Sequence, residues 1–189
     1  MVTGTPGVGK TAVSKFLVSK LNATRIDLTR LVKQEKLAIG VDKARKTLIV
    51  DMKKISERVQ DIIKSCDQDI IIDGHYSINV LPAKKVHLAF VLRQDPKELK
   101  KILEDRDFKS RKLWENLAAE ILDVCLWDAV RVCGAHKVCE INVTSKTIEE
   151  VAEEIVAVLE EKRKCIVGVV DWLGKLEKEG QLNEFLRDF

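Results

Sequence analysis

Several features are scarce in this chain of 189 residues, and each absence narrows the class of protein. Aromatic residues make up only 5% of the chain, prolines number three, and no repeat or low-complexity segment interrupts it. No apolar run reaches the roughly 20 residues of a membrane-spanning helix, and we find no secretory signal peptide before the first motif. We therefore expect a cytoplasmic globular protein with one main domain.

The cysteines and the net charge narrow the class of protein further. The five cysteines are odd in number and contain no C-x-x-C pair, so we interpret them as scattered thiols of a reducing compartment rather than a disulfide framework or a zinc site. The formal net charge of +3 is too small to indicate nucleic-acid binding by itself. Basic residues cluster in "KQEK", "DKARK" and "RDFKSRK", and solvated helix faces explain most of them.

Short apolar segments alternate with amphipathic ones along the chain. The predicted strands are residues 1–3, 24–27, 69–73, 86–92 and 138–143. The predicted helices are residues 10–21, 28–38, 52–65, 95–105, 112–133 and 147–164, and residues 40–50 are expected to form a connection. The alternation predicts an α/β fold with three layers and a mainly parallel five-stranded sheet. We assign residues 1–164 to this domain and residues 165–189 to an apolar C-terminal extension.

Residues 4–11, "GTPGVGKT", match the pattern G-x-x-x-x-G-K-[ST] through Gly4, Gly9, Lys10 and Thr11. Glycines let the backbone N–H groups point into the turn, and the helix that follows adds its positive end. We expect Lys10 to reach the β- and γ-phosphates of a nucleoside triphosphate and Thr11 to bind Mg²⁺. A chance match is the alternative, although a predicted helix follows directly. The loop predicts triphosphate binding without defining a reaction.

A second acidic element, "IIIDGH", ends a predicted strand at Asp73. Proteins with this loop place there a carboxylate that holds Mg²⁺ or its water, and an exposed strand-end aspartate is the alternative. His75 follows two residues later and lies near the same edge. It could orient a water or a phosphate, or it could equally be a core histidine with satisfied hydrogen bonds.

Two basic segments could serve phosphate transfer. Arg106, Arg111 and Lys112 of "RDFKSRK" lie between predicted helices. They could close over phosphates and neutralise charge on the transferred group, or form a solvated turn. The connection over residues 28–50 supplies cations for an acceptor phosphate, namely Arg30, Lys33, Lys36 and Arg45. We find no guanine-reading N-K-x-D pattern, which weakens a GTPase interpretation.

Four segments taken together resemble the atypical adenylate kinases of small-subunit ribosome maturation, which are phosphate-loop NTPases. They are "GTPGVGKT", "IDGHY", "FVLRQD" and "RDFKSRKLWENLAAEILDVC". The family includes the eukaryotic nuclear adenylate kinase and archaeal counterparts, and the resemblance is strongest to the archaeal members. It covers about residues 1–162, and the lid pattern followed by "AEILDV" is more specific than the loop alone.

The resemblance implies a core sheet, a monophosphate-binding insert at about residues 29–52 and a short lid at about residues 105–115. It also implies phosphoryl transfer between ATP and AMP, with Mg²⁺ as cofactor and with accompanying ATPase activity. The partners that it implies are a small-subunit ribosomal protein of the S-eleven family and pre-rRNA. We expect a monomer or weak oligomer that does not bind membranes.

The family's site residues map onto this chain by motif. The residues expected to line ATP are Gly7, Gly9, Lys10, Thr11 and Ala12. Asp73 and His75 correspond to the family's D-x-H pair, which is tied to Mg²⁺ and water. Arg106 corresponds to the lid arginine at the ATP phosphates, with Lys109 nearby in the lid.

Some positions depart from the family pattern. Lys33 stands where an arginine is usual, and lysine lacks the two-pronged fork that grips a phosphate. Asp107 replaces the usual lid glycine and is expected to stiffen that hinge. Ala12 replaces a common hydroxyl residue, and the first strand is short.

Three functions remain open on these residues. The first is a nucleoside monophosphate kinase that transfers phosphate from ATP to AMP and also hydrolyses ATP. The second is a ribosome assembly factor whose ATP cycle switches binding to a ribosomal protein or rRNA, with the basic insert and the apolar tail as contact surfaces. The third is a kinase for another small acceptor, such as a different monophosphate or shikimate.

Overall fold

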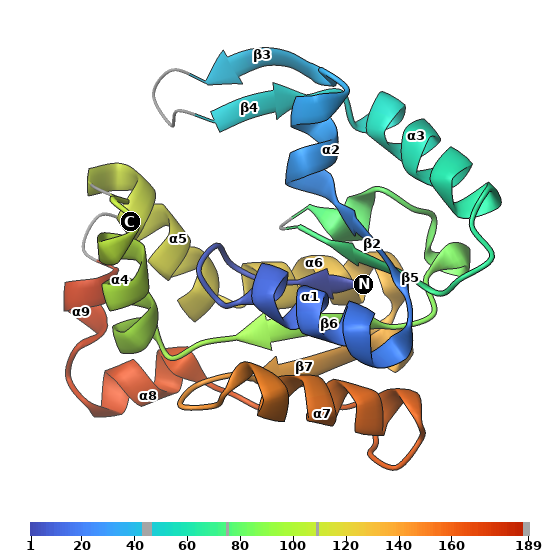
Figure 1. Ribbon diagram of the computed structural model, residues 1–189. Coiled ribbons are helices and arrows are strands. Elements are labelled where there is room, and N and C mark those ends of the chain that lie inside the picture. Colours follow the sequence, from blue (N-terminus) through green and yellow to red (C-terminus); the bar gives the residue numbers. More distant parts are fainter. Residues whose placement is uncertain (43–46, 75, 109, 187–189) are drawn as a thin grey trace.

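The computed structural model describes residues 1–42, 47–74, 76–108 and 110–186. Five of its strands form a parallel sheet in the order β2-β5-β1-β6-β7, which confirms the predicted α/β fold (Figure 1). Their bounds are Val2–Thr3 for β1, Thr24–Asp27 for β2, Ile70–Asp73 for β5, Ala89–Arg93 for β6 and Val138–Asn142 for β7. In a parallel sheet the carboxyl ends of all strands meet at one edge.

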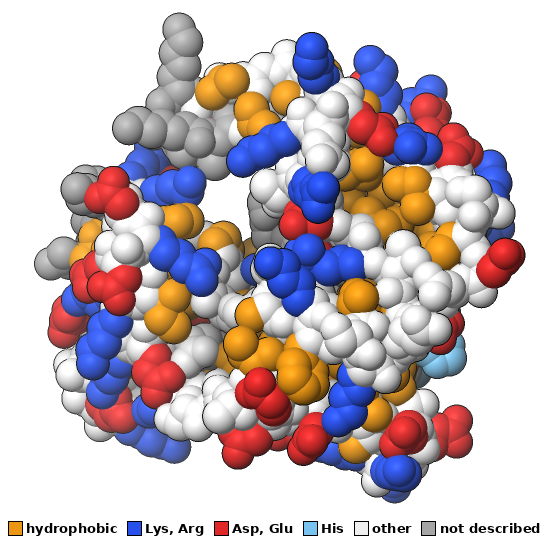
Figure 2. Space-filling model, in the orientation of Figure 1, with side chains coloured by type: hydrophobic (Ala, Val, Ile, Leu, Met, Phe, Trp, Pro, Cys, Tyr) orange, Lys and Arg blue, Asp and Glu red, His pale blue; other side chains and the backbone are white. Residues whose placement is uncertain are grey.

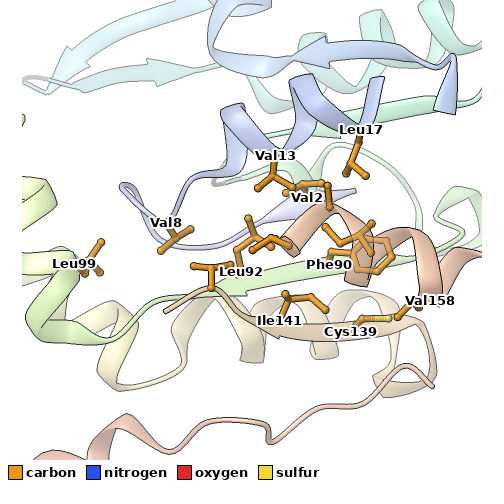
Figure 3. Close-up of a cluster of buried hydrophobic side chains, with 14 of the residues drawn as sticks. Val2, Val8, Val13, Leu17, Phe90, Leu92, Leu99, Cys139, Ile141 and Val158 are labelled. Carbon is orange, nitrogen blue, oxygen red and sulfur yellow. The ribbon is translucent and has the colours of Figure 1, made fainter. Parts of the chain in front are cut away.

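Helices cover both faces of this sheet. The helices α1 (Lys10–Leu21) and α7 (Ile148–Leu159) pack together over one face, and α6 (Val124–Cys133) lies on the other (Figure 1). The side chains of β6 alternate between the two faces, so Phe90 and Leu92 join one hydrophobic cluster while Ala89 and Val91 join the other. Figure 3 shows part of the first cluster, between the sheet and the helices α1 and α7. This double burial explains the continuous apolar runs of the strands.

The remaining elements surround this frame. The other long helices are α3 (Met52–Lys64), α4 (Pro96–Asp105) and α5 (Ser110–Ile121). A short helix α2 (Leu28–Gln34) follows β2, and 3₁₀ turns occupy Ser77–Asn79, Ala83–Lys85 and Ala135–Lys137. Asp27 caps α2 and Asp51 caps α3 by accepting backbone N–H groups, which explains why these helices begin there. No helix within the described residues is long and apolar enough to cross a membrane.

The prediction that residues 40–50 form a plain connection is wrong. The segment contributes to an antiparallel hairpin of β3 (Ala38–Asp42) and β4 (Thr47–Val50), with residues 43–46 outside the described part. Its strands carry Ile39 and Val41 on one side of the turn and Leu48 and Ile49 on the other, and β-branched and aliphatic residues of this kind favour strands.

The predicted single helix over residues 112–133 is also wrong, because the chain breaks between α5 and α6. Asp123 adopts a left-handed conformation with φ of 57°. Its carboxylate contacts the buried guanidinium of Arg93, and this contact stabilises the break between the two helices. Aspartate is among the few residues that tolerate this backbone region.

The C-terminal segment, residues 165–186, packs against the domain in two short helices, α8 (Trp172–Lys178) and α9 (Leu182–Phe185). Its side chains Trp172, Leu176 and Phe185 are buried. The segment begins at a disulfide between Cys139 of β7 and Cys165. The interpretation of all five cysteines as scattered thiols is therefore wrong for this pair, which the fold brings together across 26 positions of sequence.

Candidate functional site

A cleft of about 420 Å³ lies at the carboxyl edge of the sheet, next to the predicted phosphate loop. Figure 2 shows a hollow between the side of the molecule with α2 and the hairpin and the side with α4, with Lys and Arg side chains around it. The cleft is lined by Pro6, Gly7, Gly9, Lys10, Thr11, Ala12, Lys15, Asp27, Thr29, Asp73, Gly74 and Arg106. The structure therefore brings together most of the predicted site residues, from four separate parts of the chain.

The loop takes its shape from glycine at two positions in particular. Gly4 has φ of 135°, and a Cβ atom there would lie 2.5 Å from the carbonyl oxygen of Leu92. Gly7 has φ of 103°, and a Cβ atom would lie 2.7 Å from a methyl group of Leu99. Both positions combine a left-handed backbone with close packing, so other residues would displace the loop. Gly9, with φ of 89°, is the N-cap of α1, so the loop leads directly into the first turn of that helix.

Lys10 closes the loop from within. Its Nζ donates to the carbonyl oxygens of Gly4 and Thr5 at 2.7 and 2.8 Å. Burial lowers the pKa of Lys10 from 10.5 to about 8, although the negative charges of Glu120 and Asp73 oppose the shift. The ammonium group is thus held at the centre of the turn, where an anionic phosphate would strengthen its charged form.

Asp73 and Thr11 meet at the floor of the cleft. The Thr11 hydroxyl donates to Asp73 Oδ2 at 3.2 Å, and Asp73 is only 3% exposed. Its other oxygen, Oδ1, is buried and has no hydrogen-bond partner within the described residues. A buried carboxylate oxygen without a partner is costly, and oxygen ligands from carboxylate and hydroxyl suit Mg²⁺. The chemistry of these two side chains therefore fits a magnesium ion, and the ligand roles of Thr11 and Asp73 stay predictions.

Arg25 is a site residue that the sequence analysis missed. Its Nη2 lies 2.9 Å from Asp73 Oδ2 and 2.9 Å from Asp27 Oδ2. β2 and β5 pair so that Asp27 is opposite Asp73, and the guanidinium neutralises both carboxylates. Arg25 and Asp27 both lie in the predicted strand "TRID". The sequence signal for them was this charged pair at the end of a strand, whereas the pairing of that strand with Asp73 is visible only in the fold.

The predicted lid contributes Arg106, which caps the end of α4 and lines the cleft with its side chain exposed. Asp107 follows with φ of 60°, a left-handed conformation that favours glycine. It is the position at which the family resemblance implies a glycine. His75 and Lys109 lie outside the described residues, so their predicted roles stay predictions.

The predicted acceptor residues are placed less centrally. Thr29, at the start of α2, lines the main cleft. Arg30 lines a second pocket of about 220 Å³ together with Arg25 and Gln34. Lys33 lies exposed on α2 and lines neither of these two pockets. The structure thus puts α2 beside the cleft without bringing Arg30 and Lys33 to its lining.

The fold and the site define a class of protein. A parallel sheet in this strand order, with a glycine-rich loop that enters α1 and a strand-end aspartate beside it, is the arrangement of phosphate-loop kinases. The family model described as "AAA domain" matches residues 1–123.

Similar archaeal proteins show which family the chain belongs to. It is 39% identical to the "Putative adenylate kinase" of Methanocaldococcus jannaschii, over 92% of either chain. It is 36% identical to the protein of the same name from Methanosarcina barkeri, over 91% of this chain and 96% of that one. The chain belongs to this family of phosphate-loop proteins.

Solved structures agree on the fold. The shikimate kinase of Bacteroides thetaiotaomicron superposes with a TM-score of 0.56 at 17% identity, over 84% of this chain and 96% of that one. A gluconokinase of Sinorhizobium meliloti gives a TM-score of 0.53 at 14% identity, over 85% and 90%. At such low identity the likeness concerns the fold alone.

Proposed function

We propose that the protein is an adenylate kinase that transfers the γ-phosphate of ATP to AMP and also hydrolyses ATP. The observation that carries this proposal is the cleft itself, in which Lys10, Thr11 and Asp73 share a lining with Arg106 from the lid segment. The names of the archaeal relatives supply the choice of AMP as acceptor.

The residues have separate roles in such a transfer. The backbone N–H groups of the loop and Lys10 would hold the β- and γ-phosphates, and Arg106 would neutralise charge on the transferred group. Thr11 and Asp73 would hold the magnesium ion, which when bound would supply positive charge to neutralise the phosphates. Catalysis is then positioning and charge neutralisation, with no covalent bond to the protein.

The acceptor is proposed to enter from the side of α2. Thr29 reaches the cleft, and Arg30 and Lys33 supply positive charge on the same helix. A lysine is a point charge without a bidentate fork, so we expect Lys33 to bind a monophosphate more weakly than an arginine would. Lys33→Arg should then lower the KM for AMP and leave the KM for ATP unchanged.

A paired assay tests the proposal. ADP formation from ATP plus AMP is compared with phosphate release from ATP alone, in magnesium buffer. Lys10→Ala should abolish both activities, whereas Lys64→Ala, at the exposed end of α3, should retain both. If AMP leaves turnover unchanged and no second ADP appears, the transfer reaction is wrong, and a panel of other acceptors then tests a kinase for a different small molecule.

We also propose that the balance between transfer and hydrolysis depends on His75, the histidine of the D-x-H pattern. Hydrolysis needs a positioned water, whereas transfer needs the acceptor in line and water excluded. His75→Ala should therefore lower phosphate release more than ADP formation. Equal losses in the two assays would contradict a water-orienting role.

A second candidate function is an ATP-switched factor in late maturation of the small ribosomal subunit, supported by the family resemblance and by one surface. The hairpin exposes Ile39 and Val41 to 66% and 56%, beside the exposed Leu48 and Ile49. The C-terminal segment buries Trp172, Leu176 and Phe185 but exposes Ile166, Val167, Val169 and Leu173, so part of it also offers an apolar contact surface. Val41→Thr should weaken ATP-dependent capture of an S-eleven-family protein or pre-rRNA, with adenylate kinase activity as the control.

A further inference from the structure

We propose that Glu120 is a positioning residue of the phosphate loop and that Trp172, from the C-terminal segment, supports it. Neither residue lines the cleft. The inference rests on the proposed function, since it assumes that the loop binds a nucleoside triphosphate. It assigns to the segment after Cys165 a part in nucleotide binding.

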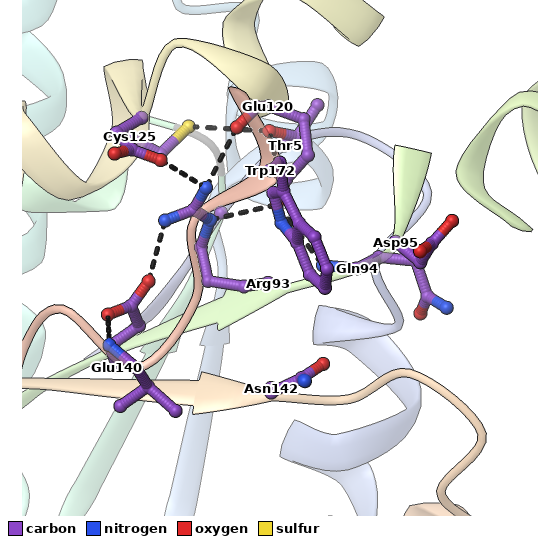
Figure 4. A network of polar contacts seen from close by, with 12 residues as sticks. Thr5, Arg93, Gln94, Asp95, Glu120, Cys125, Glu140, Asn142 and Trp172 are labelled. Atoms are coloured by element: carbon purple, nitrogen blue, oxygen red, sulfur yellow. Dashed lines mark hydrogen bonds and ion pairs between the residues drawn. The ribbon is translucent and has the colours of Figure 1, made fainter. Parts of the chain in front are cut away.

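Glu120 lies in α5 with 1% of its surface exposed, and both of its carboxylate oxygens are engaged. Oε2 accepts the Thr5 hydroxyl at 2.5 Å. Oε1 accepts from Arg93 Nε at 2.8 Å, from the Gln94 backbone N–H at 3.1 Å and from the Trp172 indole N–H at 3.2 Å. Figure 4 shows Glu120 between Thr5 on one side and Arg93 and Trp172 on the other.

The charges around Glu120 hold the carboxylate in one place. Arg93 is also 1% exposed, and its guanidinium contacts Glu140 and Asp123 as well as Glu120. Buried charges are tolerated only when they are paired and hydrogen-bonded. Moving Glu120 would leave Arg93 short of a partner in the interior, so the Thr5 hydroxyl binds to a fixed acceptor.

Thr5 transmits this fixed position to the loop. It is fully buried, and its backbone carbonyl accepts Lys10 Nζ at 2.8 Å while the neighbouring Gly4 carbonyl accepts the same group at 2.7 Å. The side chain of Thr5 is thus held by Glu120 and its backbone holds Lys10. A looser Thr5 would let the carbonyls and the lysine shift away from the arrangement that fits a triphosphate.

The C-terminal segment also contributes contacts to the buried charges around Arg93. The backbone N–H of Val169 donates to Glu140 Oε2 at 2.6 Å, and Glu140 Oε1 pairs with Arg93 at 2.7 Å. Trp172 then reaches Glu120 directly. The contacts run from the disulfide-anchored segment through two buried glutamates to the loop, although the segment stays outside the cleft.

A matched pair of variants tests the contact. Thr5→Val keeps the shape of the side chain but removes the hydroxyl, whereas Thr5→Ser keeps the hydroxyl. We measure the Kd of MgATP and of AMP by calorimetry, kcat and KM, and the thermal midpoint. Thr5→Val should weaken MgATP binding about tenfold, the size expected for one lost buried hydrogen bond, and leave the Kd of AMP unchanged. Thr5→Ser should restore MgATP binding to within about twofold.

A second pair tests the C-terminal segment. Trp172→Phe keeps an aromatic ring and removes the N–H that Glu120 accepts, so MgATP binding should weaken about threefold, within the range of a single hydrogen bond. Trp127→Phe is the control, because Trp127 lies 68% exposed on α6 and should bind MgATP as the unchanged protein does. Because Trp172→Phe preserves most of the packing, it remains informative even where Thr5→Val fails to fold.

The outcomes separate this inference from the proposed function. If the unchanged protein does not bind MgATP, the proposed function fails and the inference with it. If the unchanged protein binds MgATP but Thr5→Val binds it equally well, or Thr5→Ser binds as weakly as Thr5→Val, the positioning role is wrong while the proposed function stands. A lowered thermal midpoint with unchanged MgATP binding would also overturn it, because Glu120 would then serve stability alone.

Discussion

Arg25 lies against Asp73, with Nη2 2.9 Å from Oδ2, at the carboxyl ends of two neighbouring strands. The same nitrogen contacts Asp27. Burial opposes the charge on Arg25, but the hydrogen bonds and charges of the two aspartates raise its pKa. One guanidinium therefore holds together two carboxylates that would otherwise repel each other at the floor of the cleft.

Replacing this arginine should destabilise the protein. Arg25→Met leaves the buried Asp73 and the neighbouring Asp27 without their cation. We expect the free energy of unfolding in urea to fall by about 2–3 kcal/mol, less than for a fully buried pair because the Arg25 side chain is 15% exposed.

The control for Arg25 is Arg58→Met. Arg58 pairs with Glu35 on the surface, with its side chain 45% exposed, so its loss should cost about 0.5 kcal/mol or less. Adding Asp73→Asn to Arg25→Met should recover part of the loss, since the uncompensated charge is then removed. Equal effects of the two arginine variants would contradict the pairing.

The parts of the fold that the sequence predicted are those encoded by local patterns. Each of the five predicted strands became a strand of the sheet, and "GTPGVGKT" became a glycine-shaped loop at the start of α1. The edge at which parallel strands end brought Asp73 to Lys10 and Thr11, as topology requires. Local periodicity and one motif were sufficient for this much.

The parts that were missed depend on contacts between distant residues. Glu120 reads as one charge in the apolar stretch "LAAEIL", and nothing nearby identifies Arg93 or Thr5 as its partners. The break at Asp123 is explained only by the same arginine. The pairing of Cys139 with Cys165 and the burial of Trp172 likewise follow from the tertiary fold. The clearest sequence signal for Glu120 was a carboxylate at helical spacing from Leu117 and Ile121, on the face turned to the core.

The disulfide should make stability depend on reductant. A crosslink between Cys139 and Cys165 closes a loop of 26 positions, which corresponds to roughly 3–4 kcal/mol in the chain-entropy model. We expect the urea midpoint of the unchanged protein to fall on treatment with dithiothreitol, and Cys165→Ser to start at the lower value and stay there.

Cys66→Ser is the matched control for the disulfide, because Cys66 is a free, partly exposed thiol. This variant should respond to reductant as the unchanged protein does. Identical unfolding curves of the unchanged protein with and without reductant, after quantitative thiol titration, would contradict a stabilising crosslink.

The ion pair between Lys175 and Asp95 should make docking of the C-terminal segment sensitive to acid. Burial alone would raise the pKa of Asp95, but hydrogen bonds from Lys175 and from the Lys97 backbone N–H lower it overall. A lowered carboxyl pKa contributes stability above the ordinary value of 3.8, and this contribution is lost as the pH falls through the folded-state pKa. Stability should therefore decrease as the pH falls below about 4.

Asp95→Asn should flatten this acid dependence, because asparagine also caps the start of α4 but does not titrate. Urea unfolding from pH 2 to 7 measures the difference, together with hydrogen exchange of residues 172–185. Asp128→Asn, whose ion pair with Arg131 is exposed, should keep the slope of the unchanged protein. Parallel curves for Asp95→Asn and the unchanged protein would exclude the pair as the cause.

Arg106 should affect turnover and not stability. The side chain is exposed at the end of α4 and lines the cleft, so Arg106→Ala should change the free energy of unfolding by no more than about 0.5 kcal/mol. Under the proposed function its charge would meet the negative charge of the transferred phosphate, so kcat should fall by about 10²-fold or more. Arg106→Lys should recover part of kcat, because it restores the charge but not the fork.

Arg131→Ala is the control for Arg106, since Arg131 is an exposed arginine on α6 whose partner Asp128 lies on the same helix. It should leave kcat, KM and stability unchanged. If Arg106→Ala raised the KM for ATP with kcat unchanged, the residue would bind the ground state and the transition state equally. Arg106 would then hold ATP without stabilising the charge that develops during transfer, and the lid segment would act in binding rather than in the chemical step.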